Sequence, residues 1–216
     1  MKLKMLGISV ALVYGCILTT SALANDSGFY LGGSIGRAEA NFDTSGGFSG
    51  PIAGIPTTLN SVSQNSSETA WKLFGGYQIN KYFGAEVEYV DFGSYNFNGN
   101  FTLANVPFSF SGTDKITGYG LAAVGTYPFS DSFAVFGKLG VFRSKDEATV
   151  TIPNLASGSG SDDETGPVYG VGIKYSFNEN VSVRGEYERF TGIGNSSGNT
   201  ENTDINLYTV ALVYKF

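Results

Sequence analysis

The chain ends with the stretch Tyr208-Thr209-Val210-Ala211-Leu212-Val213-Tyr214-Lys215-Phe216. Side chains point alternately to the two faces of a β-strand, so every second residue of this stretch shares a face. One face carries bulky apolar side chains, from Tyr208 through Leu212 to Phe216, and the other carries smaller or charged ones. The stretch therefore predicts a β-strand with one strongly apolar face and an aromatic residue at its end.

The first residues have the organisation of a secretory signal peptide. Lys2 and Lys4 supply positive charge, residues 6–13 are almost wholly apolar, and Ala22-Leu23-Ala24 offers an A-x-A cleavage site. The apolar run is shorter than the roughly 20 residues of a membrane helix. We expect residues 1–24 to be removed and residues 25–216 to form one domain. A lipobox ending at Cys16 is the alternative, although Tyr14 fits that motif poorly.

Composition favours a membrane β-barrel over a soluble domain. Aromatic residues make up 14% of the chain, there are 30 glycines, and charged residues make up 15%, against roughly 25% in soluble domains. After the signal segment no stretch is apolar enough for a membrane helix, whereas spanning strands give only a weak sequence signal. The net charge of −6 argues against a nucleic-acid partner.

Strand-like segments alternate strictly with short turns and long loops. The expected strands are 28–42, 69–79, 82–95, 114–129, 133–150, 166–177, 181–190 and 204–216, with loops at 43–68, 96–113, 151–165 and 191–203. Short turns are expected at 80–81, 130–132 and 178–180. This plan is typical of outer-membrane barrels. We therefore predict an all-β fold, an eight-stranded antiparallel up-and-down transmembrane β-barrel with its long loops outside the cell.

The two strand faces distinguish this barrel from a soluble one. In a soluble eight-stranded barrel of the lipocalin type, bulky apolar residues would line the interior. Here acids, bases and glycines share the face opposite the bulky apolar residues. Aromatic residues also gather beside the short turns, where an interfacial girdle is expected. The pattern predicts an apolar outer surface that contacts lipid.

Several stretches resemble the membrane domain of the outer membrane protein A family. They are Gly76-Tyr77-Gln78-Ile79-Asn80-Lys81-Tyr82-Phe83-Gly84-Ala85-Glu86, Tyr127-Pro128-Phe129-Ser130-Asp131, Val183-Arg184-Gly185-Glu186-Tyr187 and the ending 208–216. The resemblance implies the outer membrane of a Gram-negative bacterium. It also implies that Tyr208, Tyr214 and Phe216 form an insertion signal for the barrel-assembly machinery. Since the sequence stops at Phe216, we expect a stand-alone barrel without the family's peptidoglycan-binding domain.

Charged residues fall on the predicted inner face, and an eight-stranded barrel is only wide enough to be filled by side chains. We expect them to pair, because an unpaired buried charge is very costly. The expected lumen charge network contains Lys72, Glu86, Glu88, Lys138, Lys174, Arg184, Glu186 and Glu188. Glu86 and Arg184 match the family's gate-like salt bridge and Glu186 matches a neighbouring acid. Val124 and Lys174 depart from it, and Lys174 could compete for Glu86. The alternative is that the network is structural packing.

Nothing in the sequence points to catalysis or to a cofactor. Barrel enzymes of the outer membrane resemble sites that need a histidine, and this chain has none. Without histidine or a mature cysteine, a transition-metal site is not expected. The run Ser161-Asp162-Asp163-Glu164 could hold Ca²⁺, but a solvated acidic loop is the favoured interpretation. We predict no catalytic residue, no metal and no cofactor.

Two functions remain open. The first is membrane integrity combined with surface contact, such as adhesion or host or phage contact, through four extracellular loops. Residues 46–56 and 101–110 are unusually apolar for loops, although they could equally extend the strands above the membrane. The alternative is a narrow porin-like channel, which Phe74, Phe136 and Phe142 would partly block. We expect a monomer in outer-membrane lipid, and predict lipopolysaccharide contacts at Arg37, Lys115, Arg143 and Arg189.

Overall fold

The computed structural model describes residues 27–41, 49–52, 55–104, 106–153, 156–193 and 204–216. The predicted signal peptide and Cys16 lie outside these residues. The strands within them are β1 (Gly28–Asn41), β2 (Ser49–Ile52), β3 (Ile55–Gln64), β4 (Ser67–Gln78), β5 (Phe83–Leu103), β6 (Val106–Pro128), β7 (Phe133–Ile152), β8 (Ala156–Ser176), β9 (Val181–Phe190) and β10 (Asp204–Lys215).

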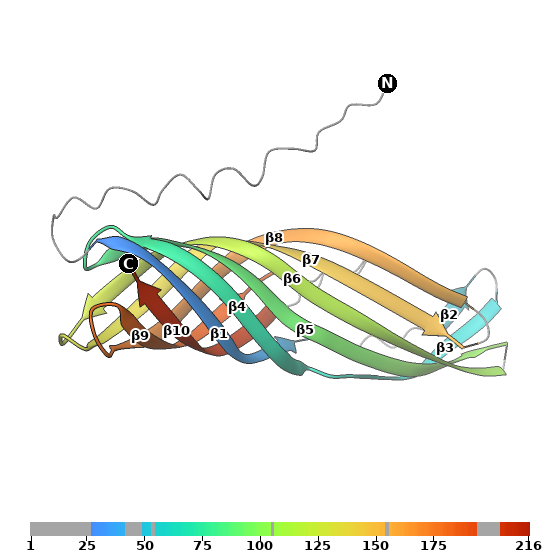
Figure 1. The fold of residues 1–216 in the computed structure, drawn as a ribbon. Helices are drawn as coiled ribbons and strands as arrows, with labels where there is room; N and C mark the ends of the chain where they lie inside the picture. The colour runs from blue at the N-terminus through green and yellow to red at the C-terminus, as the bar shows by residue number, and fades with distance from the viewer. Residues whose placement is uncertain (1–26, 42–48, 53–54, 105, 154–155, 194–203) are drawn as a thin grey trace, which may run out of the picture.

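Eight of these strands close into an antiparallel barrel (Figure 1). The ring runs β5-β4-β1-β10-β9-β8-β7-β6 and closes through pairing of β6 with β5. The predicted terminal strand pairs with the first strand, from Tyr30 opposite Lys215 to Asn41 opposite Asp204. The predicted eight-stranded barrel is thus confirmed. No helix among the described residues has the length and apolar character needed to cross a membrane.

Side chains accept backbone hydrogen bonds in all three short turns, from asparagine in two of them and from Ser130 in the third, where Ser130 Oγ accepts from the N–H of Phe133 at 3.0 Å. Asn80 Oδ1 accepts hydrogen bonds from the backbone N–H groups of Tyr82 and Phe83. Asn178 Oδ1 accepts from Asn180 and Val181 in the same way. Asparagine favours such turns because its side chain bonds the backbone two residues on. The turns therefore lie where the sequence predicts them, at the end of the barrel that also holds the carboxyl terminus (Figure 1).

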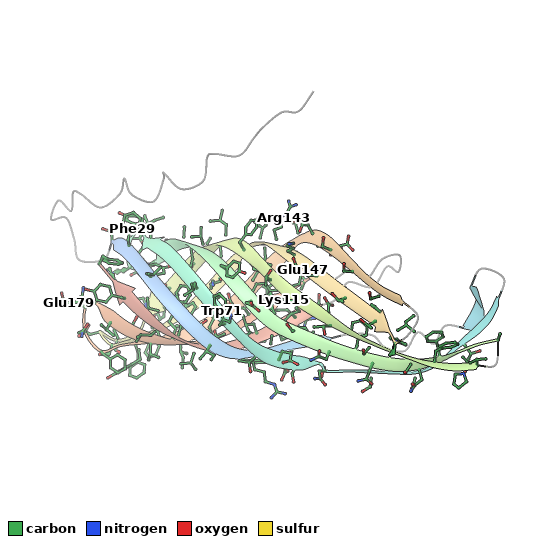
Figure 2. All side chains as sticks on the ribbon, turned by 45° about the vertical axis from the view of Figure 1, so that its right-hand side comes forward. Phe29, Trp71, Lys115, Arg143, Glu147 and Glu179 are labelled. Atoms are coloured by element: carbon green, nitrogen blue, oxygen red, sulfur yellow. The ribbon has the colours of Figure 1, made fainter. Side chains whose placement is uncertain are left out.

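The outer surface of the ring is an apolar band between two aromatic girdles. The girdle beside the short turns contains Phe29, Tyr77, Tyr82, Phe83, Tyr127, Phe129, Phe133, Tyr175, Phe177, Tyr214 and Phe216, all exposed. A second girdle contains Trp71, Tyr89, Tyr119, Tyr169 and Tyr208. Figure 2 shows Phe29 near the short turns and Trp71 nearer the middle, with Lys115, Arg143 and Glu147 beyond it. This pattern marks the part of the wall that faces lipid.

Three of the predicted loops are largely strand, which corrects the expectation of loops at 43–68, 96–113 and 151–165. β2 and β3 lie within the first, and β3 pairs with the far end of β5. β5 and β6 continue as a hairpin to Leu103 opposite Val106, and β7 and β8 continue to Ile152 opposite Ala156. Ring contacts between Phe101, Phe108 and Phe110 support the first of these hairpins. Tertiary pairing thus overrides the loop-like composition.

A bulge in β5 sets which residues of this extension face inward. The pairing with β6 shifts between Asp91 and Ser94. Gly93 has a φ of +88°, and its N–H donates to Asp91 Oδ1 at 2.9 Å. Only glycine adopts this conformation without strain. The extra residue places Tyr95 in the interior above Phe92, and both are fully buried.

Candidate functional site

The interior of the barrel holds a layer of charged side chains centred on Lys138 of β7. Its Nζ lies 2.6 Å from Glu86, 2.8 Å from Glu88, 3.2 Å from Glu186 and 2.8 Å from Glu188. These four carboxylates come from β5 and β9, on opposite sides of the ring. All five side chains are essentially inaccessible to solvent. One cation therefore links two parts of the wall that are distant in sequence.

Two further cations complete the layer. Lys72 Nζ lies 2.7 Å from Glu186 and also bonds Glu188. Arg184 Nη1 donates to Glu86 Oε2 at 2.9 Å, the pair that matches the family's gate-like salt bridge. The Arg184 guanidinium also lies over three aromatic rings, 5.0 Å from the centroids of Tyr30 and Phe136 and 5.3 Å from that of Phe74. Cation–π contacts of this kind are strongest where water is excluded.

The layer contains one more carboxylate than cations. Lys72, Lys138 and Arg184 face Glu86, Glu88, Glu186 and Glu188. Glu88 Oε1 is buried and accepts no hydrogen bond from any other described residue. Glu86 Oε1 and Glu186 Oε1 are likewise buried without a hydrogen bond, but they lie 2.6 Å and 3.2 Å from Lys138 Nζ. Glu88 Oε1 is therefore the carboxylate oxygen of the layer that has no cation partner among the described residues.

An apolar layer lies on the extracellular side of these charges. Phe92, Phe142 and Phe190 pack edge to face, with ring centroids 4.7 to 5.7 Å apart. All three are fully buried, as are Ile116 and Leu207 beside them. Phe74 and Tyr30 close the other side with Val213. The charge layer is thus sealed between two apolar layers.

One residue of the expected network lies outside it. Lys174 forms no ion pair with any described residue. It stands opposite Arg184 on β9 and Ala134 on β7, nearer the short turns than the carboxylates. The prediction that Lys174 joins the network or competes for Glu86 is therefore wrong, because its neighbour across the strand pair is a cation.

Three interior residues are not among the predicted site residues. Tyr30 donates its hydroxyl to Glu86 Oε2 at 3.0 Å, and Phe92 and Phe190 form the apolar layer. Phe92 shares the inner face of β5 with Glu88, Phe190 shares the inner face of β9 with Glu188, and Tyr30 lies on the face of β1 opposite the exposed Phe29 and Leu31. Strict alternation along each strand would have found them.

The four basic residues predicted to meet lipopolysaccharide lie near the extracellular ends of the ring strands, and each has an acidic partner. Arg37 lies 3.5 Å from Glu39, Lys115 lies 3.7 Å from Asp91, Arg143 lies 3.2 Å from Asp163, and Arg189 lies 2.6 Å from Asp204. These pairs leave little free positive charge for lipid phosphates. The contact with lipopolysaccharide stays a prediction.

The extracellular extension carries acids on both faces of β8. Asp162 and Glu164 lie on the inner face, together with Asp146 of β7 and Asp114 of β6, by strand alternation from the buried Val168, Phe142 and Ile116. Burial, together with the neighbouring acids Asp114, Asp162 and Glu164, raises the pKa of Asp146 to about 8. No group of three or more such residues among those described has the geometry of a metal site. Asp114 Oδ1 and Asp146 Oδ1 are both buried, so the inner part of this acidic face is withdrawn from solvent. The solvated acidic loop at residues 161–164 stays a prediction.

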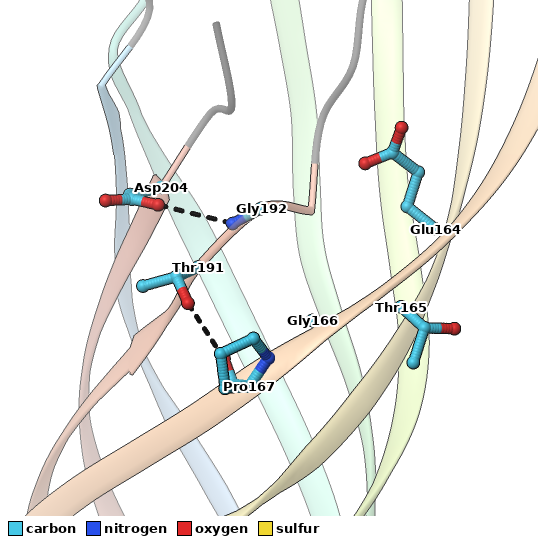
Figure 3. A pocket seen from close by; sticks show the side chains of 7 residues that line it. All are labelled: Glu164, Thr165, Gly166, Pro167, Thr191, Gly192 and Asp204. Carbon is cyan, nitrogen blue, oxygen red and sulfur yellow. Dashed lines mark hydrogen bonds between the residues drawn. The ribbon is translucent and has the colours of Figure 1, made fainter.

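A shallow pocket of about 430 Å³ lies where β9 separates from β8 (Figure 3). Thr191 donates to Pro167 O through both its N–H, at 3.1 Å, and its hydroxyl, at 3.3 Å. Asp204 accepts from Gly192 N at 3.3 Å and from Arg189 at 2.6 Å. The Glu164 side chain also lines the pocket. Two carboxylates thus face a solvent-open hollow at the rim.

Residues 24–216 match the protein family described as OmpA-like transmembrane domain. The chain belongs to this family. OmpA-like barrels are non-enzymatic proteins of the bacterial outer membrane, and this chain is an outer-membrane barrel of that kind. Tyr208, Tyr214 and Phe216, predicted as its insertion signal, are exposed on the lipid face.

The chain is similar to outer membrane protein A of Salmonella typhi, with 29% identity, and of Shigella flexneri, with 27% identity. Both alignments cover 100% of this chain and 56% of the relative, so the chain spans about half the length of the curated relatives it matches. The expectation of a stand-alone OmpA-like barrel without a peptidoglycan-binding domain stays a prediction.

Solved structures of small barrels share the fold. OprG of Pseudomonas aeruginosa superposes with a TM-score of 0.51 at 18% identity, covering 88% of this chain and 97% of that chain. Neisserial surface protein A gives a TM-score of 0.50 at 18% identity, covering 88% of this chain and 99% of that chain. The likeness concerns the barrel architecture.

Proposed function

We propose that this OmpA-like barrel supports outer-membrane integrity through its ring and contacts molecules outside the cell through its extended hairpins. The observation that carries the proposal is the contrast between a filled interior and a large extracellular surface. Charge and apolar layers occupy the lumen, while β5 to β8 continue far beyond the lipid-facing band (Figure 1). Contacts made by loops and hairpins on a rigid scaffold are a common route to recognition.

The narrow channel is the alternative function, and the interior layers argue against it. A conducting path would have to displace the rings of Phe92, Phe142 and Phe190, which are in mutual contact. Single-channel recording in planar bilayers tests this alternative with wild type, Glu86→Ala and Arg184→Ala. We expect silence from all three. Discrete openings in wild type that either substitution enlarges would favour a gated channel instead.

Shortening the hairpins tests the membrane-integrity role of the ring and the surface-contact role of the hairpins independently. In the truncated variant, residues 96–113 and 145–163 are each replaced by an Asn-Gly turn, which favours a tight hairpin. Folding of the ring is checked by heat-modifiable gel migration. We expect the variant to restore detergent resistance to a strain lacking the protein but to lose adhesion to cultured epithelial cells. Equal adhesion by the full-length protein, the truncated variant and the strain lacking the protein would contradict the surface-contact role.

A further inference from the structure

Beyond the ring, the wall of the barrel is open along one edge. β8 pairs with β7 along its whole length, but it pairs with β9 only from Val168, opposite Phe190, toward the short turn. Residues 156–167 therefore have a second edge that no described strand covers. Figure 1 shows β8 running far past the end of β9. We call residues 157–165 the β8 edge.

Strand alternation shows which backbone groups face this edge. In an antiparallel pair, the N–H and C=O of one residue point to the same neighbour, and successive residues point to opposite sides. Pro167 O accepts from Thr191 N on the β9 side, and Ser176 N donates to Ser132 O on the β7 side. The β7–β8 register has no shift between them. The residues facing the open edge are therefore Ser157, Ser159, Ser161, Asp163 and Thr165, all exposed.

The inner face of the sheet near this edge is uncovered among the described residues, and the opposite edge of the extension is blunted. A Cβ built on Gly158 or Gly160 would meet no atom within 4 Å, so the inner face there is uncovered by other described residues. The extension runs β2-β3-β5-β6-β7-β8, and its other edge is the four-residue β2. β2 contains Pro51, which has no N–H to offer a partner strand. Of the two edges of the extension, the β8 edge is the longer one, and its backbone N–H and C=O groups can pair with an added strand.

Charge indicates what this edge binds. Residues 143–165 contain two basic residues, Arg143 and Lys145, and five acidic ones. A second copy of the chain would bring like charges together, which disfavours self-pairing. Residues 194–203 of the chain itself contain one acid and no base. A basic segment of another protein is the complementary occupant.

The pocket at the lower end of the edge adds a place for a side chain. Glu164 lines it and forms no side-chain hydrogen bond or ion pair with another described residue. Asp204 on the other side is already bonded to Arg189. Figure 3 shows the Glu164 carboxylate apart from the bonded pair of Asp204 and Gly192. A lysine or arginine reaching this pocket would pair with Glu164.

We propose that the β8 edge binds an extended, lysine- or arginine-rich segment of another protein as an added strand, with one basic side chain against Glu164. Main-chain hydrogen bonds supply affinity in this mode of recognition, and side-chain pockets supply specificity. The inference rests on the proposed surface-contact function, and it names the partner's chemistry and the place where it binds.

The test uses a synthetic peptide of alternating lysine and threonine, about ten residues long to match the edge, added to the folded barrel in detergent micelles. NMR amide exchange should show new protection at the odd-numbered residues 157–165 and no change at the even-numbered ones, which already pair with β7. A peptide of the same charge, N-methylated at alternate amides, should bind at least tenfold more weakly, since it cannot form the ladder. Equal binding by the methylated peptide would overturn the proposal.

Two matched variants locate the site. Ser159→Pro/Ser161→Pro removes two N–H groups that face the edge and leaves the β7 ladder intact, whereas Ser159→Ala/Ser161→Ala keeps them. We expect about tenfold weaker peptide binding for the proline variant and unchanged binding for the alanine variant. Equal binding by both would contradict the proposal.

Three further outcomes are informative. Binding that appears only after residues 194–203 are replaced by a glycine-serine linker would mean that the chain covers its own edge, which overturns the proposal. If the proline variant lost peptide binding but kept full adhesion, the β8 edge would not be the adhesive surface, and the proposed function would stand without this partner. If truncation failed to reduce adhesion while the peptide still bound, the proposed function alone would fall.

Discussion

The same strands form two regions that differ in their surroundings: a closed ring in lipid and an extension with an open edge in water. In the ring every strand has two neighbours, the outer face is apolar and the interior is filled by paired charges. In the extension the outer face is polar, acids lie on both faces of β8, and one edge has no partner strand among the described residues. Lipid demands closure because it cannot satisfy backbone polar groups, whereas water permits an open edge. The difference assigns stability to the ring and recognition to the extension.

The largest expected effect comes from breaking the charge layer. Lys138→Met would leave four buried carboxylates facing only Lys72 and Arg184. Removing one partner of a buried ion network costs about 3–5 kcal/mol, because the remaining charge is uncompensated. We expect the midpoint of urea unfolding in lipid vesicles, followed by gel migration, to fall accordingly.

Glu88→Gln is the matched control for this variant. It keeps the shape of the side chain and equalises the numbers of cations and carboxylates in the layer. We expect a change in unfolding free energy below about 1 kcal/mol, since Glu88 Oε1 has neither a hydrogen bond nor an ion pair with a described residue, whereas the unbonded oxygens of Glu86 and Glu186 lie near Lys138 Nζ. If Lys138→Met were as mild as Glu88→Gln, the charge layer would not be what holds the ring together.

The ring was predictable from sequence because its signal is local. A period of two places charges on one face and bulky apolar residues on the other, and asparagine-containing turns fix where strands reverse. The extension was not predictable in the same way. The stretch around Asn96 to Asn100 has the composition of a loop, and only its pairing with β6 and β3 makes it a strand. The bulge at Gly93 then changes which residues face inward.

The interior site shows the same limit. Alternation correctly assigned Glu86 and Arg184 to the inner face, where they form an ion pair at 2.9 Å. Alternation also assigned Lys174 to the inner face. It does not give the position of a side chain along the barrel axis. That position depends on the register between strands, and register places Lys174 beside Arg184 rather than beside an acid. Contacts between strands far apart in sequence are fixed only by closure of the ring.

The stability of the extension, unlike that of the ring, should depend on pH through Asp146. Burial, together with Asp114 on β6 and Asp162 and Glu164 on β8, raises the pKa of Asp146 to about 8. The folded state therefore binds this proton more tightly than the unfolded state, whose carboxyl titrates near pH 4. The resulting stability is present at acidic pH and is lost as the pH rises toward 8.

We expect amide protection in the distal parts of β6 and β7 to fall between pH 5 and pH 9, after correction for intrinsic exchange. The change should be about 1–2 kcal/mol, allowing for solvent around this partly exposed group. Amides of the ring serve as the internal reference and should show no such trend. Asp146→Asn should abolish the pH dependence, and persistence of the trend in that variant would assign it to other groups.

The smallest expected effect is at the boundary between the two regions. Arg143 Nη2 lies 3.2 Å from Asp163 Oδ2, and both side chains are 51% exposed. Exposed pairs of this kind contribute about 0.2–1 kcal/mol and weaken with salt. Arg143→Gln should therefore change ring stability by less than about 0.5 kcal/mol at physiological salt. It should also strengthen binding of the lysine-threonine peptide about twofold, because it frees a carboxylate on the β8 edge. Weaker binding by this variant would mean that Arg143 itself contacts the peptide. Attraction of the basic peptide to the acidic residues would then not be the whole basis of binding at the β8 edge.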